Sequence, residues 1–479
     1  MTNRAGQRRL EWSLAIALLA LMGLTPASMA SEGSTPVTCD DLIAAVSDPY
    51  SPREVIVRAR GADGELAAGR ATEVVHNSGG EVVQRLPLIG GTLARLPLDR
   101  ACRLDDEPGI VVTPNVGAES SGEPEARRVS TSYPFTVRAT DAWSTLGATG
   151  AGIAVAVVDS GVASTPDLGR RVTHVRVNPS LGVGDRFGHG THVAGVIAGR
   201  DPLGRFVGIA PDAHIVDVKV LDSDGMGDLG TVLTGLQWVS DNAVRKGIRV
   251  VNLSIGTGEP LGYRQHPLNA AVEALWRQGL VVVAAGGNSG PGSEAVSMAP
   301  GNDPFVITAG GLDDAGTRSP GDDSLAPFTS VGTTVDGYAK PDLLAPAVGV
   351  QATLAPGSLL MREHPDAVSG RTLRMSGTSV SAAVVSGVAA GVLGHRPALS
   401  PDLVKAYLTR DSRRISDGGV VDELAVLVDR APIEPANAGL TPAPTLDGLW
   451  GEAESQASWA RASWARASWA RASWARATW

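Results

Sequence analysis

The hydrophobic positions between residues 150 and 310 fall into short, well-separated runs. The runs are Ile153–Val158, Ile215–Leu221, Val250–Ile255, Leu280–Ala285 and Phe305–Ala309. Strands that are buried on both faces of a parallel sheet read as continuous apolar runs of this kind. Helical patterns fill several of the gaps, at Thr191–Ala198, Leu229–Arg245 and Leu268–Gln278. This alternation predicts an α/β layered domain with a mostly parallel sheet, in which active residues are expected at the carboxyl ends of strands.

A different pattern before residue 130 predicts a separate, small unit. Four short strand-like runs accompany one helix-like segment, Glu65–His76. The strand-like runs are Glu54–Ala59, Val82–Leu86, Gly91–Leu96 and Ile110–Val112. These elements predict a small open α+β sandwich. The stretch Glu119–Glu125 that follows is polar and rich in breakers, so it is predicted to be an exposed linker.

The N-terminus up to Ala30 has the three parts of an export signal. A positively charged start is followed by the apolar stretch Leu14–Leu24 and by small residues over Ser28-Met29-Ala30. A single-span anchor is the alternative, although the apolar stretch is short for it. Arg8-Arg9 also permits a twin-arginine signal. Residues 1–30 are therefore predicted to be a signal peptide, and the protein to be secreted or extracellular.

The C-terminal part of the sequence has a composition unlike the rest. After residue 430 the chain is rich in Pro and Ala, which predicts a linker over residues 431–456. Residues 457–479 then repeat Ala-Ser-Trp-Ala-Arg nearly unchanged, a spacing that fits neither a helix face nor one side of a strand. One interpretation is an unstructured tail. The other is an adhesive tail that binds a cell envelope or a polymer surface through its Trp and Arg side chains.

Charge and cysteine content exclude several classes of protein. The net charge is -9, and no basic domain offsets it, which argues against a nucleic-acid-binding protein. The chain has 2 cysteines, too few for a cysteine-rich scaffold or a thiolate metal cluster. Cys39 and Cys102 bracket the small unit, and an exported chain could oxidise them to one disulfide.

Three residues stand where an α/β domain places its chemistry. Asp159 ends the first apolar run, and His189 comes where a helix is predicted to begin. Ser379 lies in a Gly-Thr-Ser turn that opens into the small-residue run Ala382–Gly394. Each residue alone has an ordinary interpretation: Asp159 as a turn cap and Ser379 as a helix N-cap. His189 with His192 would suggest a metal site, but no third ligand has a suitable spacing.

Together these residues supply the parts of an acyl-transfer triad. An imidazole takes the proton of the serine, and a buried carboxylate fixes the ring tautomer and stabilises the imidazolium. In this combination and order the motifs resemble those of the subtilisin family (subtilases) of serine peptidases. The resemblance implies Asp159 as the orienting acid, His189 as the general base and Ser379 as the nucleophile. It extends over about residues 130–425 and includes Lys340–Pro346 as a further landmark.

The resemblance also implies an organisation for the whole chain. Residues 131–430 would form a three-layer subtilisin-like domain with a mostly parallel sheet. Residues 31–130 would form an inhibitor-like α+β propeptide and its linker, which self-cleavage would remove. The cut is expected in the linker between Val116 and Thr131, near Arg127-Arg128.

Further site residues follow from the resemblance alone. Asn288, in a Gly-rich turn after a strand, would donate to the oxyanion, although an Asn after two glycines also suits an ordinary turn. Two segments, Ser254-Ile255-Gly256 and Gly225-Met226-Gly227, would hold the substrate by strand pairing. Without the resemblance, the first would be interpreted as an ordinary strand end and the second as an ordinary loop.

Three departures from the family pattern are present. Val380 and Ser381 replace the usual Met and Ala after the nucleophile, and Ala383 replaces a usual Pro, but none of these positions supplies a catalytic group. The third departure is the segment Arg200–Arg205, where many relatives carry a calcium-binding loop. Its single acidic residue, Asp201, stands among arginines that would repel a cation. We therefore expect neither a metal ion nor a cofactor.

The sequence thus predicts a secreted serine endopeptidase made as a self-processing precursor. Its expected partners are protein or peptide substrates and its own propeptide as inhibitor. One alternative is a catalytically silent subtilase that acts as a binding protein, and the presence of all triad residues weighs against it. Another is an esterase, whose nucleophile usually lies in Gly-x-Ser-x-Gly, and Ser379 does not.

Overall fold

The computed structural model describes residues 50–442, with short gaps at residues 62, 106, 121–122, 125–130, 203, 205, 258–260 and 293–295. The chain divides into two compact units, and the division falls between Asn115 and Val116. We call residues 50–115 the first unit and residues 116–442 the second unit. The division falls before the boundary predicted at residue 130, because residues 117–120 and 123–124 form strands within the second unit.

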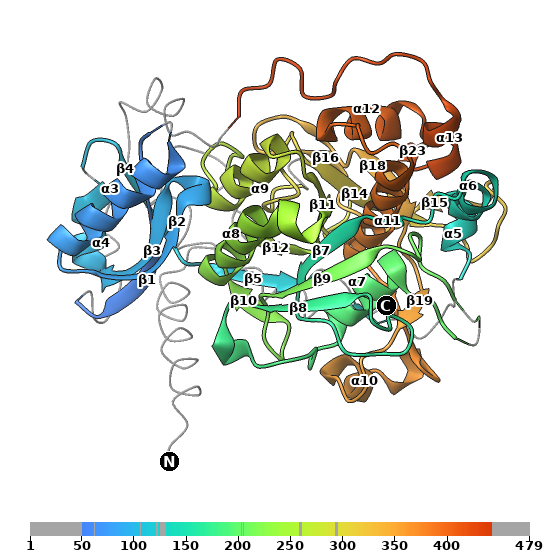
Figure 1. Ribbon diagram of the computed structural model, residues 1–479, viewed down its shortest axis with the longest axis horizontal. Helices are drawn as coiled ribbons and strands as arrows, with labels where there is room; N and C mark the ends of the chain where they lie inside the picture. The colour runs from blue at the N-terminus through green and yellow to red at the C-terminus, as the bar shows by residue number, and fades with distance from the viewer. Residues whose placement is uncertain are drawn as a thin grey trace. The chain divides into compact units, whose positions relative to one another are not determined.

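The first unit is an antiparallel sheet with two helices (Figure 1). In sheet order the strands are β2 (Glu81–Leu86), β3 (Gly91–Pro97), β1 (Pro52–Ala59) and β4 (Ile110–Pro114), and the helices are α3 (Gly64–Asn77) and α4 (Leu98–Asp105). The predicted strands and the predicted helix are all present. Helix α4 was not predicted, because its Leu98-Ala101-Leu104 stripe is short and lies among charged residues. Cys102, on this helix, is disulfide-bonded, and the other cysteine, Cys39, lies outside the described residues.

The second unit is built on a large, mostly parallel sheet (Figure 1). Its strands, in spatial order, are β22 (Arg413–Ile415), β23 (Gly418–Val420), β18 (Leu343–Pro346), β14 (Ile307–Asp313), β13 (Val281–Ala285), β11 (Ile248–Leu253), β7 (Ala154–Asp159), β9 (His214–Lys219) and β8 (Val172–Arg176). Neighbours from β23 to β8 are parallel, whereas β22 and the short β15 (Ser324–Leu325) pair antiparallel. The five apolar runs form the centre of this sheet, which confirms the predicted fold class.

Helices cover both faces of this sheet and complete three layers (Figure 1). They are α5 (Tyr133–Thr136), α6 (Ala139–Leu146), α7 (His189–Ala198), α8 (Leu229–Lys246), α9 (Pro267–Arg277), α10 (Leu359–Glu363), α11 (Thr378–His395), α12 (Pro401–Arg410) and α13 (Glu423–Val428). Side chains of a strand alternate between faces, so Val158 of β7 lies near Gly235 of α8 while Asp159 faces α7. Helices α7 and α11 pack against each other on this second face.

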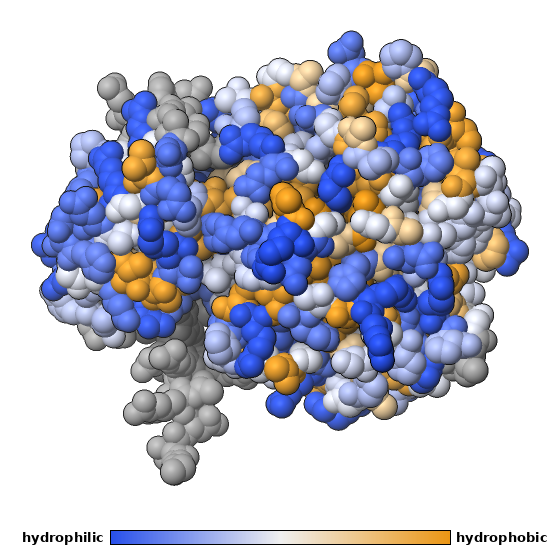
Figure 2. Space-filling view, in the orientation of Figure 1, coloured by the Kyte–Doolittle hydropathy of each residue, from blue (hydrophilic) through white to orange (hydrophobic). Residues whose placement is uncertain are grey.

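Helix α11 is the central helix of the core. By length and composition it could cross a membrane, but 89% of its most apolar window is buried inside the fold. Its small residues allow close packing, and a Cβ on Gly387 would lie 2.5 Å from Cβ of Ile209. Hydrophobic side chains in the space-filling view are interspersed with hydrophilic ones (Figure 2). Most apolar side chains of the sheet and of α11 are instead enclosed between the layers.

Three smaller sheets lie at the edges of the second unit. One has the order β10 (Met226–Asp228), β5 (Gly117–Ser120) and β12 (Ile255–Thr257). Another joins β19 (Val350–Thr353), β21 (Thr372–Ser376) and β20 (Val368–Ser369), with β6 (Glu123–Pro124) on β21, and β16 (Gly332–Thr333) pairs with β17 (Ala339–Lys340). Residues 119–120 and 123–124, predicted to belong to an exposed linker, instead lie in the paired strands β5 and β6. Backbone pairing with neighbouring strands orders this segment, and the composition of a polar stretch does not reveal such pairing.

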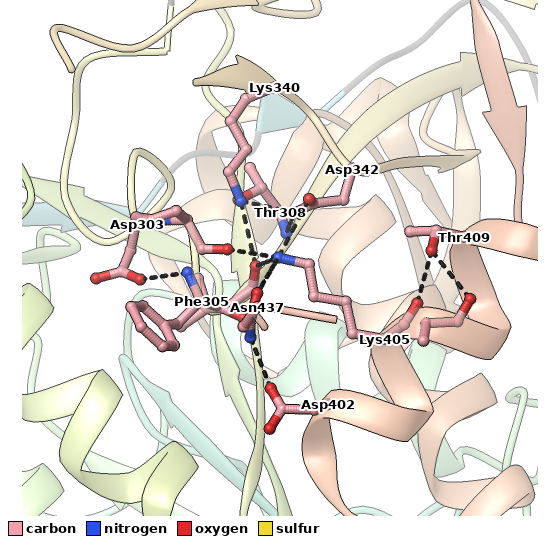
Figure 3. Close-up of polar contacts among 12 residues, drawn as sticks. Asp303, Phe305, Thr308, Lys340, Asp342, Asp402, Lys405, Thr409 and Asn437 are labelled. Carbon is pink, nitrogen blue, oxygen red and sulfur yellow. Dashed lines mark hydrogen bonds and ion pairs between the residues drawn. The ribbon is translucent and has the colours of Figure 1, made fainter. Parts of the chain in front are cut away.

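A buried ionic cluster lies beneath α12 (Figure 3). Nζ of Lys340 donates to Oδ2 of Asp342 at 2.7 Å, and Nζ of Lys405 lies 3.3 Å from Oδ1 of the same carboxylate. Burial alone would raise the pKa of Asp342, but the two lysines outweigh it and the pKa is lowered. Burial raises the pKa of nearby Asp303 to about 7 and lowers that of Lys340 to about 8. This cluster ties β17, β18 and α12 together.

Residues 431–442, the first part of the segment predicted to be a linker, lie against this region. Nδ2 of Asn437 donates to the Phe305 carbonyl at 3.0 Å and to Oδ1 of Asp402 at 2.8 Å. The Tyr263 hydroxyl donates to the Thr441 carbonyl at 3.0 Å. The proline-rich composition therefore marks an irregular chain that is nevertheless bonded to the second unit.

Glu423 gives a pH-dependent prediction for stability. Its carboxyl oxygens are fully buried without a hydrogen-bond partner in the described part of the chain, and burial raises its pKa well above the ordinary value of 4.5. Because the folded-state pKa exceeds the unfolded one, the stability that this group contributes is present below about pH 4.5 and is lost as pH rises through the folded-state pKa. Glu423→Gln should therefore gain stability over the parent by about 1 kcal/mol per pH unit above pH 4.5.

The measurement is the free energy of unfolding from denaturant titrations between pH 4 and pH 8. The control is Glu363→Gln, at an exposed position, which should leave the slope unchanged. A Glu423→Gln variant whose stability tracks that of the parent at every pH would contradict the prediction.

Candidate active site

Asp159 and His189 form a buried hydrogen-bonded pair. Strand β7 ends at Asp159 and helix α7 begins at His189, so both residues lie at the carboxyl edge of the sheet. Nδ1 of His189 lies 2.8 Å from Oδ1 and 2.9 Å from Oδ2 of Asp159, and the two side chains are 0% and 1% exposed. A carboxylate oxygen accepts, so Nδ1 carries the proton and Nε2 is left as the basic nitrogen. Nε2 has no hydrogen-bond partner within the described residues.

Glycine at position 190 is required for this close approach. A Cβ on Gly190 would lie 2.3 Å from the Gly161 carbonyl oxygen and 3.1 Å from Oδ1 of Asp159. The start of α7 can therefore reach the end of β7 only without a side chain there.

Ser379 lies in the first turn of α11. Gly377, with φ of 142°, forms the sharp entry to the helix, and its N–H donates to the Ala347 carbonyl at 2.9 Å. The Ser379 hydroxyl is buried and, in the described part of the chain, has no hydrogen-bond partner. Helices α7 and α11, which begin at His189 and Thr378, pack against each other. Oγ of Ser254 donates to the Ser379 carbonyl at 2.8 Å and so fixes this turn to the end of β11.

Asn288 is bonded to the same turn. The Thr378 N–H donates to Oδ1 of Asn288 at 2.9 Å, and the Gly287 N–H donates to Oγ1 of Thr378 at 3.0 Å. Since Oδ1 accepts from the backbone, Nδ2 is the end of the amide that can donate beside Ser379. The turn after β13 and the start of α11 are thus locked together by reciprocal hydrogen bonds.

Asp185 is a central residue of the site that the sequence did not reveal. Its carboxylate is buried and accepts from Oγ of Ser160 at 3.0 Å, from the Gly188 N–H at 2.7 Å and from both the N–H and the hydroxyl of Thr191. Burial raises the pKa of Asp185, against the lowering effect of these hydrogen bonds. The carboxylate connects the residue after Asp159 to the residues around His189. In the sequence it is one Asp in a Gly-rich loop, without a distinguishing signal.

Lys219, at the end of β9, holds the opposite side of these loops. Its Nζ donates to the Ser160 carbonyl at 2.5 Å and to the Gly184 carbonyl at 2.9 Å. Burial lowers the pKa of this lysine, which nearby carboxylates partly offset. Gly161 passes close to the same loop, since a Cβ there would lie 2.7 Å from the Gly184 oxygen. Lys219 therefore joins the loop that follows β7 to the loop that precedes α7.

His192 does not belong to a metal site. Its Nε2 donates to the Val350 carbonyl at 3.0 Å, and burial lowers its pKa to about 3, so the ring is neutral and structural. The segment compared with a calcium loop does not fit that cation either. One nitrogen of Arg371 lies 2.9 Å from Asp167 and 3.1 Å from Asp201, so a guanidinium already pairs with both carboxylates. Within the described residues, no group of three His, Cys, Asp or Glu side chains could hold a metal ion.

The segments predicted to bind substrate flank the strand β5. Ile255 and Gly256 belong to β12, and Met226 and Gly227 belong to β10, while Ser254 and Gly225 directly precede these strands. Both strands pair antiparallel with β5, which lies between them.

Strand β6 pairs with the strand that leads into the turn before α11. Glu123 is opposite Ser376 and Pro124 is opposite Met375 on β21, which leads directly into Gly377 and α11. Residues 118–120 therefore pair with β12, which begins next to Ser254, and residues 123–124 pair with β21, which ends next to Gly377.

Comparison with known proteins identifies relatives of the second unit. The chain is 39% identical over 280 residues to serine protease AprX of Bacillus subtilis, an alignment that covers 56% of this chain and 63% of AprX. It is 34% identical over 264 residues to subtilisin Savinase of Lederbergia lenta, covering 55% of this chain and 84% of that protein. The alignment with M-protease of Shouchella clausii covers 59% of that protein. The chain therefore spans about three fifths of the length of some of these relatives.

Among solved structures, fervidolysin from Fervidobacterium pennivorans has a similar fold. The TM-score is 0.61 at 24% identity, over 80% of this chain and 62% of that one. At this identity the likeness concerns the fold. The family model described as the subtilase family, Peptidase_S8, matches residues 150–426, which include Asp159, His189 and Ser379. With this match over more than half of its length, the chain belongs to the subtilase family.

Proposed function

We propose that the protein is a secreted serine endopeptidase that hydrolyses peptide bonds through Asp159, His189 and Ser379. The observation that carries the proposal is the buried pair formed by Asp159 and Nδ1 of His189, with Nε2 left unpartnered among the described residues. The hydroxyl of Ser379, at the start of the adjacent helix, is likewise unpartnered within that part of the chain. An unpartnered base and an unpartnered hydroxyl in one buried region suit a proton transfer that occurs when substrate is present.

The proposed reaction proceeds in two acyl-transfer steps. Oγ of Ser379 attacks the substrate carbonyl, and Nε2 of His189 takes the hydroxyl proton, while the Asp159 carboxylate stabilises the imidazolium. The negative oxygen of the tetrahedral intermediate accepts from Nδ2 of Asn288 and from the Ser379 N–H at the positive end of α11. The imidazolium then protonates the leaving amine, and water, deprotonated by the same nitrogen, hydrolyses the acyl-enzyme.

Substrate binding would use the backbone of β10 and β12. An extended peptide between two strands gains hydrogen bonds that do not depend on its sequence, which suits an enzyme that cleaves proteins. Strand β5 already pairs in this way within the chain, with Glu119 opposite both Met226 and Gly256. The segment over residues 117–124 is therefore a model for a bound substrate.

We extend the proposal to self-processing. The first unit, residues 50–115, precedes two short strands that pair with β12 and with β21, the strand that leads into α11. Self-cleavage would separate an N-terminal propeptide, which then remains as an inhibitor through β5. A parallel sheet requires contacts distant in sequence and folds slowly, so a preceding unit that assists its folding is physically reasonable.

Secretion and surface binding rest on parts of the sequence outside the described residues. The signal pattern of residues 1–30 supports export, and the Trp/Arg repeat of residues 457–479 supports retention on a cell envelope or polymer.

The first prediction tests the triad. Ser379→Ala, His189→Ala and Asp159→Asn should each lower kcat/KM for a peptide substrate by about a thousandfold or more, the scale on which such triads act. Because the three groups act as a unit, the Ser379→Ala/His189→Ala double variant should be little worse than either single one. Each variant is checked for folding by circular dichroism, and the parent is labelled with a fluorophosphonate. A folded parent that takes no label and cleaves no peptide would instead be a binding protein.

The second prediction concerns self-processing. The flanking strand pairs predict that the cut falls between Ser120 and Glu123, upstream of Arg127-Arg128, a pair outside the described residues. The parent should yield a shortened chain whose N-terminus, read by mass spectrometry, begins within this interval. Ser379→Ala should remain at precursor length. Trimming of purified Ser379→Ala to the same size would refute self-cleavage.

The third prediction concerns the C-terminal repeat. Regular spacing lets several weakly binding Trp and Arg side chains engage one surface together. Deletion of residues 457–479 should reduce retention on envelope fractions severalfold and leave turnover of a small peptide unchanged. Equal retention of both forms in a sedimentation assay would exclude the adhesive interpretation, and a loss of turnover would make the repeat part of the folded enzyme.

A further inference from the structure

We propose that Asn252 and Ser386 are positioning residues that hold Ser379 in place for its attack on the substrate. They act through a buried chain of hydrogen bonds that ends at the carbonyl of Ser379. This inference rests on the proposed peptidase function and adds two residues to the support of the same site.

Asn252 is a polar side chain in an apolar part of the large sheet. It lies on β11, where Val157 of β7 and Val283 of β13 are its neighbours in register on either side. All three side chains are 0% exposed. An amide that is buried among valines costs free energy unless its polar atoms are hydrogen-bonded. The partners of its two polar ends therefore decide what Asn252 does in the fold.

Both polar ends of Asn252 are bonded, and together they connect two positions of α11. Oδ1 accepts from the Ser386 hydroxyl at 2.9 Å, and Nδ2 donates to Oγ of Ser254 at 2.8 Å. Oγ of Ser254 in turn donates to the Ser379 carbonyl at 2.8 Å. Each donor in this chain meets an acceptor, and all of these residues are 0% exposed. Hydrogen bonds in series in a protein interior strengthen one another, so the chain acts as one restraint.

Ser386 ties the same helix to β11 a second time. It comes about two helical turns after Ser379, so the two residues lie near the same face of α11. A serine inside a helix often returns its hydroxyl to a carbonyl of the preceding turn. Ser386 instead donates across to Asn252. The first turn of α11 and a point two turns farther on are therefore both held by the end of one strand.

The same strand is paired with the strand that carries Asp159. Strand β11 runs parallel to β7, and Asn252 is level with Val157, which comes shortly before Asp159. Asp159 holds His189 through Nδ1. By restraining α11 against β11, the chain of hydrogen bonds fixes Ser379 to the sheet that also fixes Asp159. A misplacement of about 1 Å can cost about a hundredfold in rate, so this restraint should affect the chemical step.

Ser381 provides a matched control on the same helix. Its side chain is also 0% exposed, and its hydroxyl donates to the Ala345 carbonyl at 2.9 Å. It is closer to Ser379 in the sequence than Ser386 is, but its hydrogen bond lies outside the chain that ends at Ser379. Replacement of either serine by alanine removes one buried hydrogen bond. A purely structural role of Ser386 would therefore give the two variants similar kinetics.

The test measures kcat and KM of self-processed full-length enzyme on a peptide anilide. Fluorophosphonate labelling counts the active sites, so that a loss of folded protein is not taken for a loss of rate. Ser386→Ala should lower kcat at least about fivefold and leave KM within about twofold, because substrate contacts persist while the attacking hydroxyl is less well held. Ser381→Ala should change kcat by no more than about twofold.

A second variant breaks the chain in the middle. Asn252→Leu removes both hydrogen bonds of the amide at similar volume and should lower kcat at least about tenfold. Addition of Ser386→Ala to this variant should cost little more, since the chain is already broken. Additive losses would show that the two residues act separately and would overturn the chain. If Asn252→Leu does not fold, Ser386→Ala, which removes a single hydroxyl, decides the test by itself.

The outcomes separate this inference from the proposed function. If the parent takes no fluorophosphonate label and cleaves no peptide, the peptidase proposal fails. If the parent is active but Ser386→Ala keeps its kcat, or loses no more than Ser381→Ala does, the positioning role is overturned while the peptidase function remains. A rise in KM at unchanged kcat would also overturn it, because it would indicate a role in substrate binding.

Discussion

The hydrogen bond between the Asp159 carboxylate and Nδ1 of His189 is the contact on which the site depends. It fixes the ring tautomer, and it requires the end of β7 and the start of α7 to meet at 2.8 Å. A parallel sheet brings strand ends and helix starts to one edge, but it does not by itself bring them this close. Gly190 permits the approach, and Asp185 and Lys219 hold the two loops in place around it. The chemistry is thus supported by a second layer of buried charge.

Ser379, the proposed nucleophile, is positioned by the same kind of restraint. The turn before α11 is bonded to Asn288 after β13 and to Ser254 after β11, so the ends of two strands define where Ser379 lies. Helix α11 then continues into the core, where its small residues let it pack closely. A displacement of this helix would move the nucleophile. The packing of the core and the position of Ser379 are therefore coupled through this helix.

Backbone pairing connects the catalytic geometry with recognition. Residues 117–120 and 123–124 are recognised through main-chain register on strands that adjoin Ser254 and Gly377. Such pairing depends on backbone geometry and not on side-chain identity.

The sequence alone determined the elements that depend on local pattern. Apolar runs predicted the central parallel strands, and Asp159, His189 and Ser379 could be singled out because each follows a strand or begins a helix. The sequence did not reveal Asp185, whose partners lie in other loops, or α4, whose apolar stripe is short. It also assigned residues 119–125 to an exposed linker, because hydrogen bonds between backbones leave no trace in composition. Local periodicity thus predicts helices and strands. Buried charged clusters and strand pairing depend on segments that only the tertiary structure brings together.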